Sequence, residues 1–221
     1  MGLIAALEWL GRPYQLTRVD MLGEMRHDAY GRINPRHETP AFVTDDGRLL
    51  TETMAIAAWL EAREADRRVS FDPLTPEADR MWQLMAFINT GFTGAFTPLW
   101  AAWEGRMPEA DKAALRAFGA EQVRRRHDQL ERLLGDTPYA IADRPTLADG
   151  IFVGVARWVD FHQLGDPARW PRIALLRERL ESDSAVRFAT GIEAGEEPAG
   201  SAAYRGHVSL AELTSAYGAE A

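Results

Sequence analysis

The stretch from residue 34 to residue 63, NPRHETPAFVTDDGRLLTETMAIAAWLEAR, constrains the fold of this chain more than any other part of it. It contains a short apolar run at 41–43, the turn sequence Asp45-Asp46-Gly47 and a second extended segment at 48–50. Glycine accepts a positive φ without steric cost, so Asp-Gly between two extended segments is a strong turn signal. The stretch therefore predicts a β-hairpin.

A helix start follows the hairpin. Thr51-Glu52-Thr53 precedes apolar residues that are spaced to line one helix face: Ile56, Ala57 and Leu60. The first amides of a helix have no partner within it, and together with the positive end of the dipole they attract a carboxylate. A neighbouring glutamate can accept hydrogen bonds from an ammonium group. With Thr39-Pro40 ahead of the first strand, the stretch predicts a site for a small zwitterionic ligand.

The order of proline, strand, hairpin, Glu-Thr and helix resembles the second half of the thioredoxin-like domain of the glutathione transferases. That family usually has Val-Pro, with a cis proline, where this chain has Thr39-Pro40, and Glu-Ser where it has Glu52-Thr53. The resemblance implies that glutathione binds as co-substrate. The backbone of Thr39, beside Pro40, would pair with its cysteinyl part, and Glu52 and Thr53 would hold its γ-glutamyl end. Each motif taken singly has a plain alternative: Thr39-Pro40 would be only a turn, and Glu52-Thr53 would be only a helix cap.

The N-terminal residues extend the resemblance. Leu3, Ile4, Leu7 and Leu10 predict a helix over 3–10 that Gly11 ends, and β-forming residues predict a strand over 14–19. LEWLGRPY at 7–14 is similar to the family pattern that leads into its second strand. The family's first strand and the loop with its catalytic Tyr or Ser would lie before residue 1. We therefore expect these parts to be lacking from this sequence, either because its N-terminus is lost or starts at an internal Met, or because the natural protein lacks them. The catalytic residue is unknown.

Two departures from the family pattern leave alternatives open. Glu38 stands where the family commonly has a basic residue or Gln, and a carboxylate there would repel the glycyl carboxylate of glutathione. Either Arg36 or another residue takes over, or Glu38 faces solvent. His37, two residues before Thr39, is either an exposed loop histidine or a functional one.

The rest of the chain reads as helical. We expect an α/β thioredoxin-like domain at 1–64, incomplete without its first strand, then a linker at 65–76. An all-α helical-bundle domain at 77–192 and a tail at 193–221 would follow. No strand-like alternation persists beyond the linker, although 209–217 could form one helical segment.

Within the helical region, two groups of residues have an expected role. Thr146 and Asp149 have the spacing of a capping box, with Asp in place of the usual Glu, and resemble the family's structural capping element. Phe92, Phe96 and Trp100 lie four residues apart around a glycine-rich break. Large aromatics mostly build cores, but the resemblance makes these three candidates for the wall of the co-substrate pocket. Leu115, Phe118, Leu130, Leu133 and Leu134 are spaced for packing on one helix.

Composition excludes several classes of function. The chain has 221 residues, no cysteine and a net charge of −8, which excludes disulfides, thiolate metal sites and a cysteine nucleophile and argues against nucleic-acid binding. The five histidines show no metal-ligand spacing, so no metal is expected. No run approaches the length of a membrane span, and we expect a cytoplasmic protein that does not bind membranes.

The resemblance implies a transferase that uses glutathione on small apolar electrophiles, working as a homodimer. A catalytically inactive, transferase-like binding or regulatory protein is the main alternative. A glutathione-dependent isomerase, dehalogenase or peroxidase is a second enzymatic one.

Overall fold

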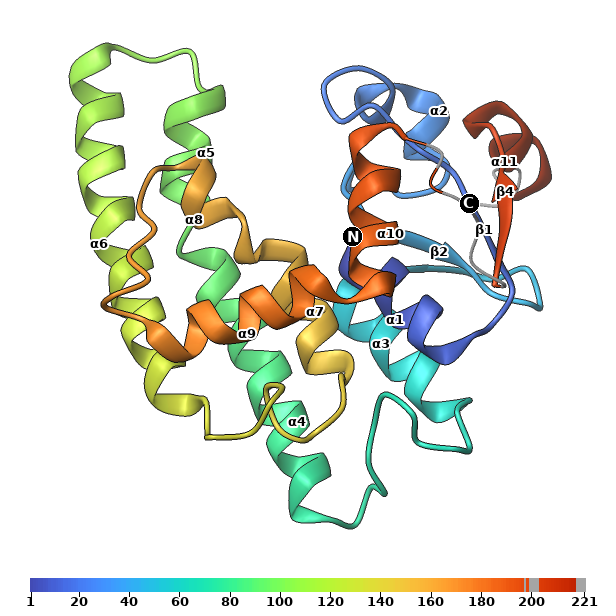
Figure 1. Ribbon diagram of the computed structural model, residues 1–221. Helices are drawn as coiled ribbons and strands as arrows, with labels where there is room; N and C mark the ends of the chain where they lie inside the picture. Colours follow the sequence, from blue (N-terminus) through green and yellow to red (C-terminus); the bar gives the residue numbers. More distant parts are fainter. Residues whose placement is uncertain (197, 199–202, 218–221) are drawn as a thin grey trace.

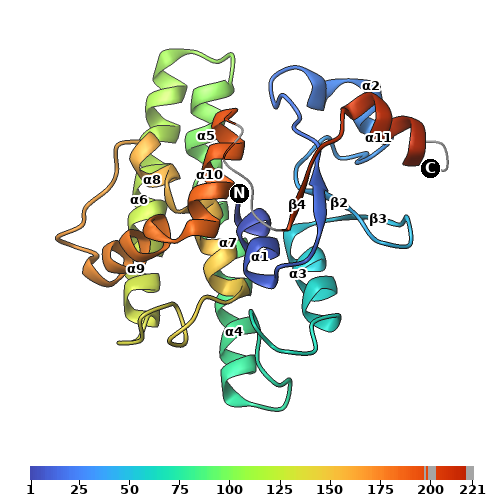
Figure 2. The same ribbon diagram turned by 45° about the vertical axis from the view of Figure 1, so that its right-hand side comes forward.

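The computed structural model describes residues 1–196, 198 and 203–217. An N-terminal α/β unit packs beside a larger helical unit (Figures 1 and 2). The elements of the first unit are α1 (Gly2–Leu10), β1 (Tyr14–Leu16), η1 (Glu24–Arg26), α2 (Asp28–Gly31), β2 (Ala41–Val43), β3 (Leu49–Thr51) and α3 (Thr53–Ala62). This is the thioredoxin-like architecture that the sequence predicts.

The helical unit follows a connection without regular structure. Its elements are α4 (Pro76–Ala86), the π-helical turn η2 (Phe87–Phe92), α5 (Thr97–Glu104), α6 (Glu109–Leu133), α7 (Leu147–Ala156), α8 (Trp158–Phe161), α9 (Pro171–Ser182) and α10 (Ser184–Ala194). A further strand and helix, β4 (Tyr204–His207) and α11 (Leu210–Tyr217), lie back on the N-terminal unit (Figure 1).

The described strands form two separate two-stranded sheets. β2 and β3 are the predicted antiparallel hairpin, with Phe42 opposite Leu50, and Gly47 in the turn has a φ of 82°. β1 pairs in parallel with β4, with Tyr14 opposite Tyr204. The expectation that no strand follows the linker is therefore wrong. β1 is also shorter than the predicted strand over 14–19, because the pairing with β4 ends at Leu16.

α1 joins the two units. It ends at Gly11, whose φ is 65°, as the sequence predicts. Its apolar face packs against α7 and α10. The backbones of α1 and α7 approach each other closely at glycines. A Cβ on Gly2 would lie 1.9 Å from the carbonyl oxygen of Gly150, which leaves no room for a side chain. The N-terminal ammonium group pairs with Glu193 of α10 at 2.5 Å.

α7 is the central helix of the core. Apolar side chains on all its faces are buried, which is typical of a helix enclosed by others. The predicted capping box at its start is confirmed: Asp149 accepts hydrogen bonds from the backbone amide and the hydroxyl of Thr146, each at 2.8 Å. On α6, Leu130 is fully buried, but Phe118 is exposed, so its predicted packing role is wrong. Of the described helices, none is long and apolar enough to cross a membrane.

Candidate functional site

The loop before β2 is held in place by the helix that precedes it. The Thr39–Pro40 peptide bond is cis. The phenol of Tyr30 and the side-chain amide of Asn34 both donate to the carbonyl oxygen of Glu38, at 2.8 and 2.6 Å. Tyr30 and Asn34 are both 2% exposed, so α2 and the residues after it fix the backbone just ahead of Thr39 from the protein interior.

His37 is part of the same loop. Its backbone φ is 55°, and Nδ1 lies 2.8 Å from the carbonyl oxygen of Met25. Because a carbonyl oxygen can only accept, Nδ1 carries the hydrogen of this contact. The ring also lies against Gly31, where a Cβ would come within 3.0 Å of it. These contacts give His37 a role in shaping the loop.

The start of α3 has an unusual backbone conformation. Glu52, its N-cap residue, has φ 69° and ψ 123°, a region that non-glycine residues rarely adopt, at a cost of about 1–3 kcal/mol. The Glu52 carbonyl accepts from the Ile56 amide at 3.0 Å, but the side chain does not cap the helix. Among the described residues, none accepts from the amides of Thr53 and Met54. These amides, at the positive end of the dipole, are the features of an anion site.

Arg36 connects the loop and the helix start. Its guanidinium lies 2.9 Å from a carboxylate oxygen of Glu38 and 3.4 Å from one of Glu52. The three side chains are more than half exposed, so the pairs contribute little to stability. They do change the local charge, because Arg36 offsets the Glu38 carboxylate. The hydrogen bond to Glu38 raises the pKa of Arg36. The departure at Glu38 is thus compensated within the loop.

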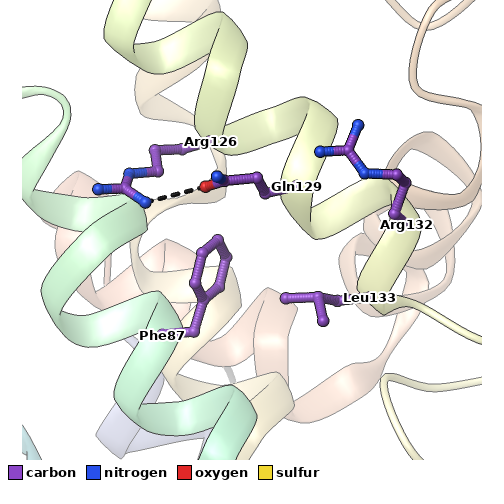
Figure 3. A pocket seen from close by; sticks show the side chains of 5 residues that line it. All are labelled: Phe87, Arg126, Gln129, Arg132 and Leu133. Atoms are coloured by element: carbon purple, nitrogen blue, oxygen red, sulfur yellow. Dashed lines mark hydrogen bonds between the residues drawn. The ribbon is translucent and has the colours of Figure 1, made fainter.

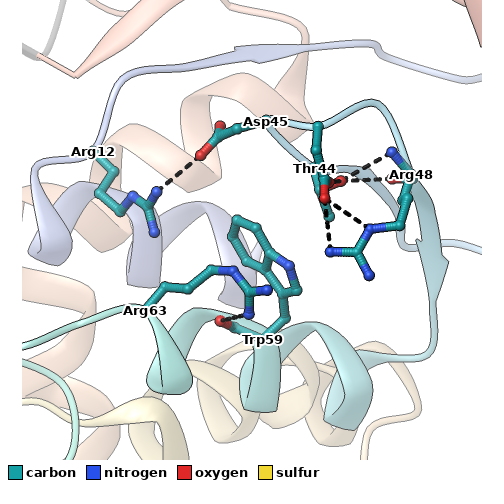
Figure 4. Close-up of polar contacts among 7 residues, drawn as sticks. Arg12, Thr44, Asp45, Arg48, Trp59 and Arg63 are labelled. Atoms are coloured by element: carbon teal, nitrogen blue, oxygen red, sulfur yellow. Dashed lines mark hydrogen bonds and ion pairs between the residues drawn. The ribbon is translucent and has the colours of Figure 1, made fainter.

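Other polar contacts fix the frame around these residues (Figure 4). Arg12, in the loop after α1, pairs with Asp45 in the hairpin turn at 3.0 Å. Trp59 of α3 lies under two guanidinium groups, with Arg63 4.4 Å and Arg12 5.4 Å from its ring centre. Cation–π contacts of this kind contribute about 0.5–1 kcal/mol each at exposed sites. They hold the hairpin and α3, and with them Pro40 and Glu52, in a fixed relation.

The structure therefore brings Thr39, Pro40, Glu52 and Thr53 onto neighbouring elements that Arg36 links. The sequence indicates Arg36 as one residue that could offset Glu38, but not that it also reaches Glu52. The sequence signal for the pair with Glu38 is that Arg36, a basic residue, lies two positions before this carboxylate. In the described part of the chain, no group of three or more His, Asp or Glu side chains could hold a metal ion.

The three aromatic candidates for the co-substrate wall lie in different environments. Phe92 and Phe96 are fully buried and contact each other at 6.1 Å between ring centres. Trp100 is half-buried and stacks on Phe161 at 5.1 Å. Its indole nitrogen is buried, and none of the described residues is a hydrogen-bond partner for it. Only Trp100 thus combines partial exposure with a free donor.

Comparison with known proteins identifies the family. Residues 2–63 match the family "Glutathione S-transferase, N-terminal domain", and residues 92–183 match "Glutathione S-transferase, C-terminal domain". Together the two matches cover more than half of the chain.

The chain belongs to the glutathione S-transferase family. The matches do not support the expectation that this chain lacks the family's first strand.

Two relatives and one solved structure are similar to most of this chain. "Glutathione S-transferase GstA" of Escherichia coli O157:H7 is 29% identical over 67% of this chain and 71% of its own length. "Maleylacetoacetate isomerase" of Pseudomonas aeruginosa is 28% identical over 88% of this chain and 92% of its own. A glutathione transferase homologue from Sulfitobacter with bound glutathione has a TM-score of 0.76 at 24% identity, covering 89% and 93%. The last likeness shows the shared fold.

Proposed function

We propose that this transferase-family chain binds glutathione at the start of α3. The observation that carries the proposal is Glu52, held at a positive φ beside open helix amides and next to the cis Thr39–Pro40 loop. The γ-glutamyl carboxylate would sit on the amides of Thr53 and Met54, and the Glu52 carboxylate would accept from the ammonium group. The backbone of Thr39 would pair with the cysteinyl part.

Arg36 completes this proposed site. It offsets Glu38 and lies beside Glu52, so an anionic ligand would not meet an uncompensated carboxylate pair. Arg36 also has donors to offer the glycyl carboxylate, because a guanidinium carries five N–H groups. The Sulfitobacter homologue, which has the same fold, was solved with glutathione bound.

Replacing Glu52 with Ala tests the site. We expect Glu52→Ala to weaken glutathione binding by about 1–3 kcal/mol, because it removes the acceptor for a charged donor. That loss corresponds to roughly 5- to 150-fold in Kd, measured by calorimetric titration. Glu121→Ala, an exposed position on α6, is the control and should bind like the parent. Unchanged affinity in Glu52→Ala would remove this residue from the site.

The proposed reaction is nucleophilic attack of the glutathione thiol on a small apolar electrophile, with Trp100 at the co-substrate. Thiolate stabilisation and positioning of the second substrate are what such chemistry needs. The catalytic residue stays unassigned. A glutathione-dependent isomerase is the second candidate, because the relative named "Maleylacetoacetate isomerase" matches nearly the whole chain. Glutathione binding without turnover of either substrate class would favour the inactive alternative.

We also propose that the protein is a homodimer. A cleft of about 350 Å³ between η2 and α6 has an apolar base of Phe87 and Leu133 and a rim of Arg126, Arg132 and Gln129 (Figure 3). Among the described residues, neither arginine forms a salt bridge. Each copy has a net charge of −8, so an acidic surface of a second copy is a complementary occupant.

Phe87→Glu tests the dimer. A carboxylate on the base of the cleft cannot be desolvated without cost, so we expect the mass in solution measured by light scattering to fall from dimer to monomer. Phe118→Glu, an exposed position on α6, is the control and should leave the mass unchanged. A monomeric parent protein would refute the dimer, and a Phe87→Glu variant that remains dimeric would place the interface elsewhere.

A further inference from the structure

The C-terminal residues 203–217, here called the C-terminal strap, lie against the N-terminal unit. β4 pairs with β1: the Tyr14 amide donates to the Ala203 carbonyl at 3.1 Å, and the Val208 amide donates to the Leu16 carbonyl at 2.8 Å. α11 packs against α2, and both views show these helices side by side (Figures 1 and 2). The strap thus covers one edge of β1 and one side of α2.

The strap is anchored to both units. The Tyr204 ring lies 5.9 Å from the Tyr14 ring of β1 and 5.4 Å from the Phe188 ring of α10, measured between centres. A pair of short strands is marginal without further packing. These contacts supply the packing that holds β4 on the N-terminal unit.

The contact with α2 leads directly to the proposed glutathione site. α2 carries Tyr30, and Tyr30 and Asn34 both donate to the carbonyl oxygen of Glu38, one residue before Thr39. Thr214 of α11 is buried and borders a cavity of about 460 Å³ that α11 shares with η1 and α2. At the end of the strap, Tyr217 reaches the hairpin, 3.6 Å from where a Cβ on Gly47 would lie.

We propose that the C-terminal strap is a positioning element for the glutathione site. By packing on α2 and on the hairpin, α11 restricts the two elements that flank the Thr39–Pro40 loop. A loop held in its bound conformation loses less conformational entropy when the ligand binds. Detaching α11 would therefore weaken glutathione binding. This inference rests on the proposed function, since glutathione is its ligand.

The alternative is that the strap only adds general stability. A charged side chain at Thr214 distinguishes the two, because Thr214 is buried where α11 meets α2, while Ala216 is exposed on the same helix and does not border the cavity. Thr214→Arg and Ala216→Arg introduce the same side chain and the same charge two positions apart. Only the first disturbs the contact with α2.

The test combines calorimetric titration of reduced glutathione with amide hydrogen exchange. For Thr214→Arg we expect the Kd for glutathione to rise by a factor of about five or more, which is the low end of the usual coupling between two sites. We also expect faster amide exchange at residues 30–38. Ala216→Arg should match the parent in both readouts. A chain ending at Val208, which removes α11 and keeps β4, should behave like Thr214→Arg and decides the question if that variant does not fold.

Two results would overturn the inference: parent-like glutathione affinity in Thr214→Arg and in the shortened chain, or unchanged exchange at residues 30–38 in both. The failure of the proposed function looks different. In that case the parent itself does not bind glutathione, while the exchange measurement still shows whether α11 restrains α2.

Discussion

Asp149→Ala is expected to lower the free energy of unfolding by about 2–4 kcal/mol, because three buried donors lose the one acceptor that they have among the described residues. Asp149 is fully buried and accepts from the amide and hydroxyl of Thr146 and from the Ala140 amide, all at 2.8 Å. The cap alone would be worth about 0.5–2 kcal/mol. The additional bond to Ala140 ties the preceding loop to the start of α7.

Burial raises the pKa of Asp149 to about 6 in spite of these donors. Removing the carboxylate therefore also removes a desolvation penalty, which offsets part of the loss. Urea-induced unfolding measures the difference in the free energy of unfolding between the two proteins, provided that their m-values are equal. Asp143→Ala, at an exposed position in the same loop, is the control and should change stability by less than about 0.5 kcal/mol. A selective loss of glutathione affinity in a stable Asp149→Ala protein would contradict its structural role.

The second large expected effect is a loss of stability at acidic pH that arises from the buried His127. His127 is 1% exposed, and its Nδ1 donates to the Val123 carbonyl at 2.8 Å. The rings of Phe92 and Trp170 lie 4.5 and 4.6 Å from its ring, between centres. This burial lowers the pKa of His127 to about 4, and Arg177 acts in the same direction, while Asp128 and Asp160 act against it.

The sign follows from linkage. Between pH 6.5 and 4 the unfolded chain binds a proton at His127 that the folded protein does not, so stability falls as the pH falls through this range. The full pKa difference corresponds to about 3 kcal/mol. His127→Leu should remove this part of the pH dependence, whereas His27→Gln, at an exposed position, should keep it. The contribution of Asp149 cancels because it is common to all three proteins. Parallel stability–pH curves for His127→Leu and the parent would refute the prediction.

Local signals were enough to predict much of the fold. The hairpin follows from Gly47 in its turn, the end of α1 from Gly11, and the start of α7 from the spacing of Thr146 and Asp149. Each of these depends on residues within a few positions of one another, where backbone preferences decide the structure. The thioredoxin-like unit was predicted from the resemblance of residues 7–14 and 34–60 to the family, and the helical unit from the spacing of its apolar residues.

Features that depend on distant contacts were not predictable. β4 is four residues long, its sequence YRGH has no apolar alternation, and its partner β1 lies nearly the whole chain away. The bridge from Arg36 to Glu52 forms only when the loop meets the start of α3. Phe92 and Trp100 belong to the same aromatic pattern in the sequence. In the structure, α6 and α7 enclose Phe92, whereas Trp100 lies against α8 and is half-buried. Whether Phe92 and Phe96 act on a co-substrate stays a prediction.

The most direct test of the central claim is calorimetric titration of this chain with reduced glutathione. We predict saturable binding with one site per chain, which Glu52→Ala weakens and Glu121→Ala leaves unchanged. A folded protein that takes up no heat of binding at several temperatures, and whose amide exchange at residues 36–54 does not change with glutathione, would contradict a glutathione site at the start of α3.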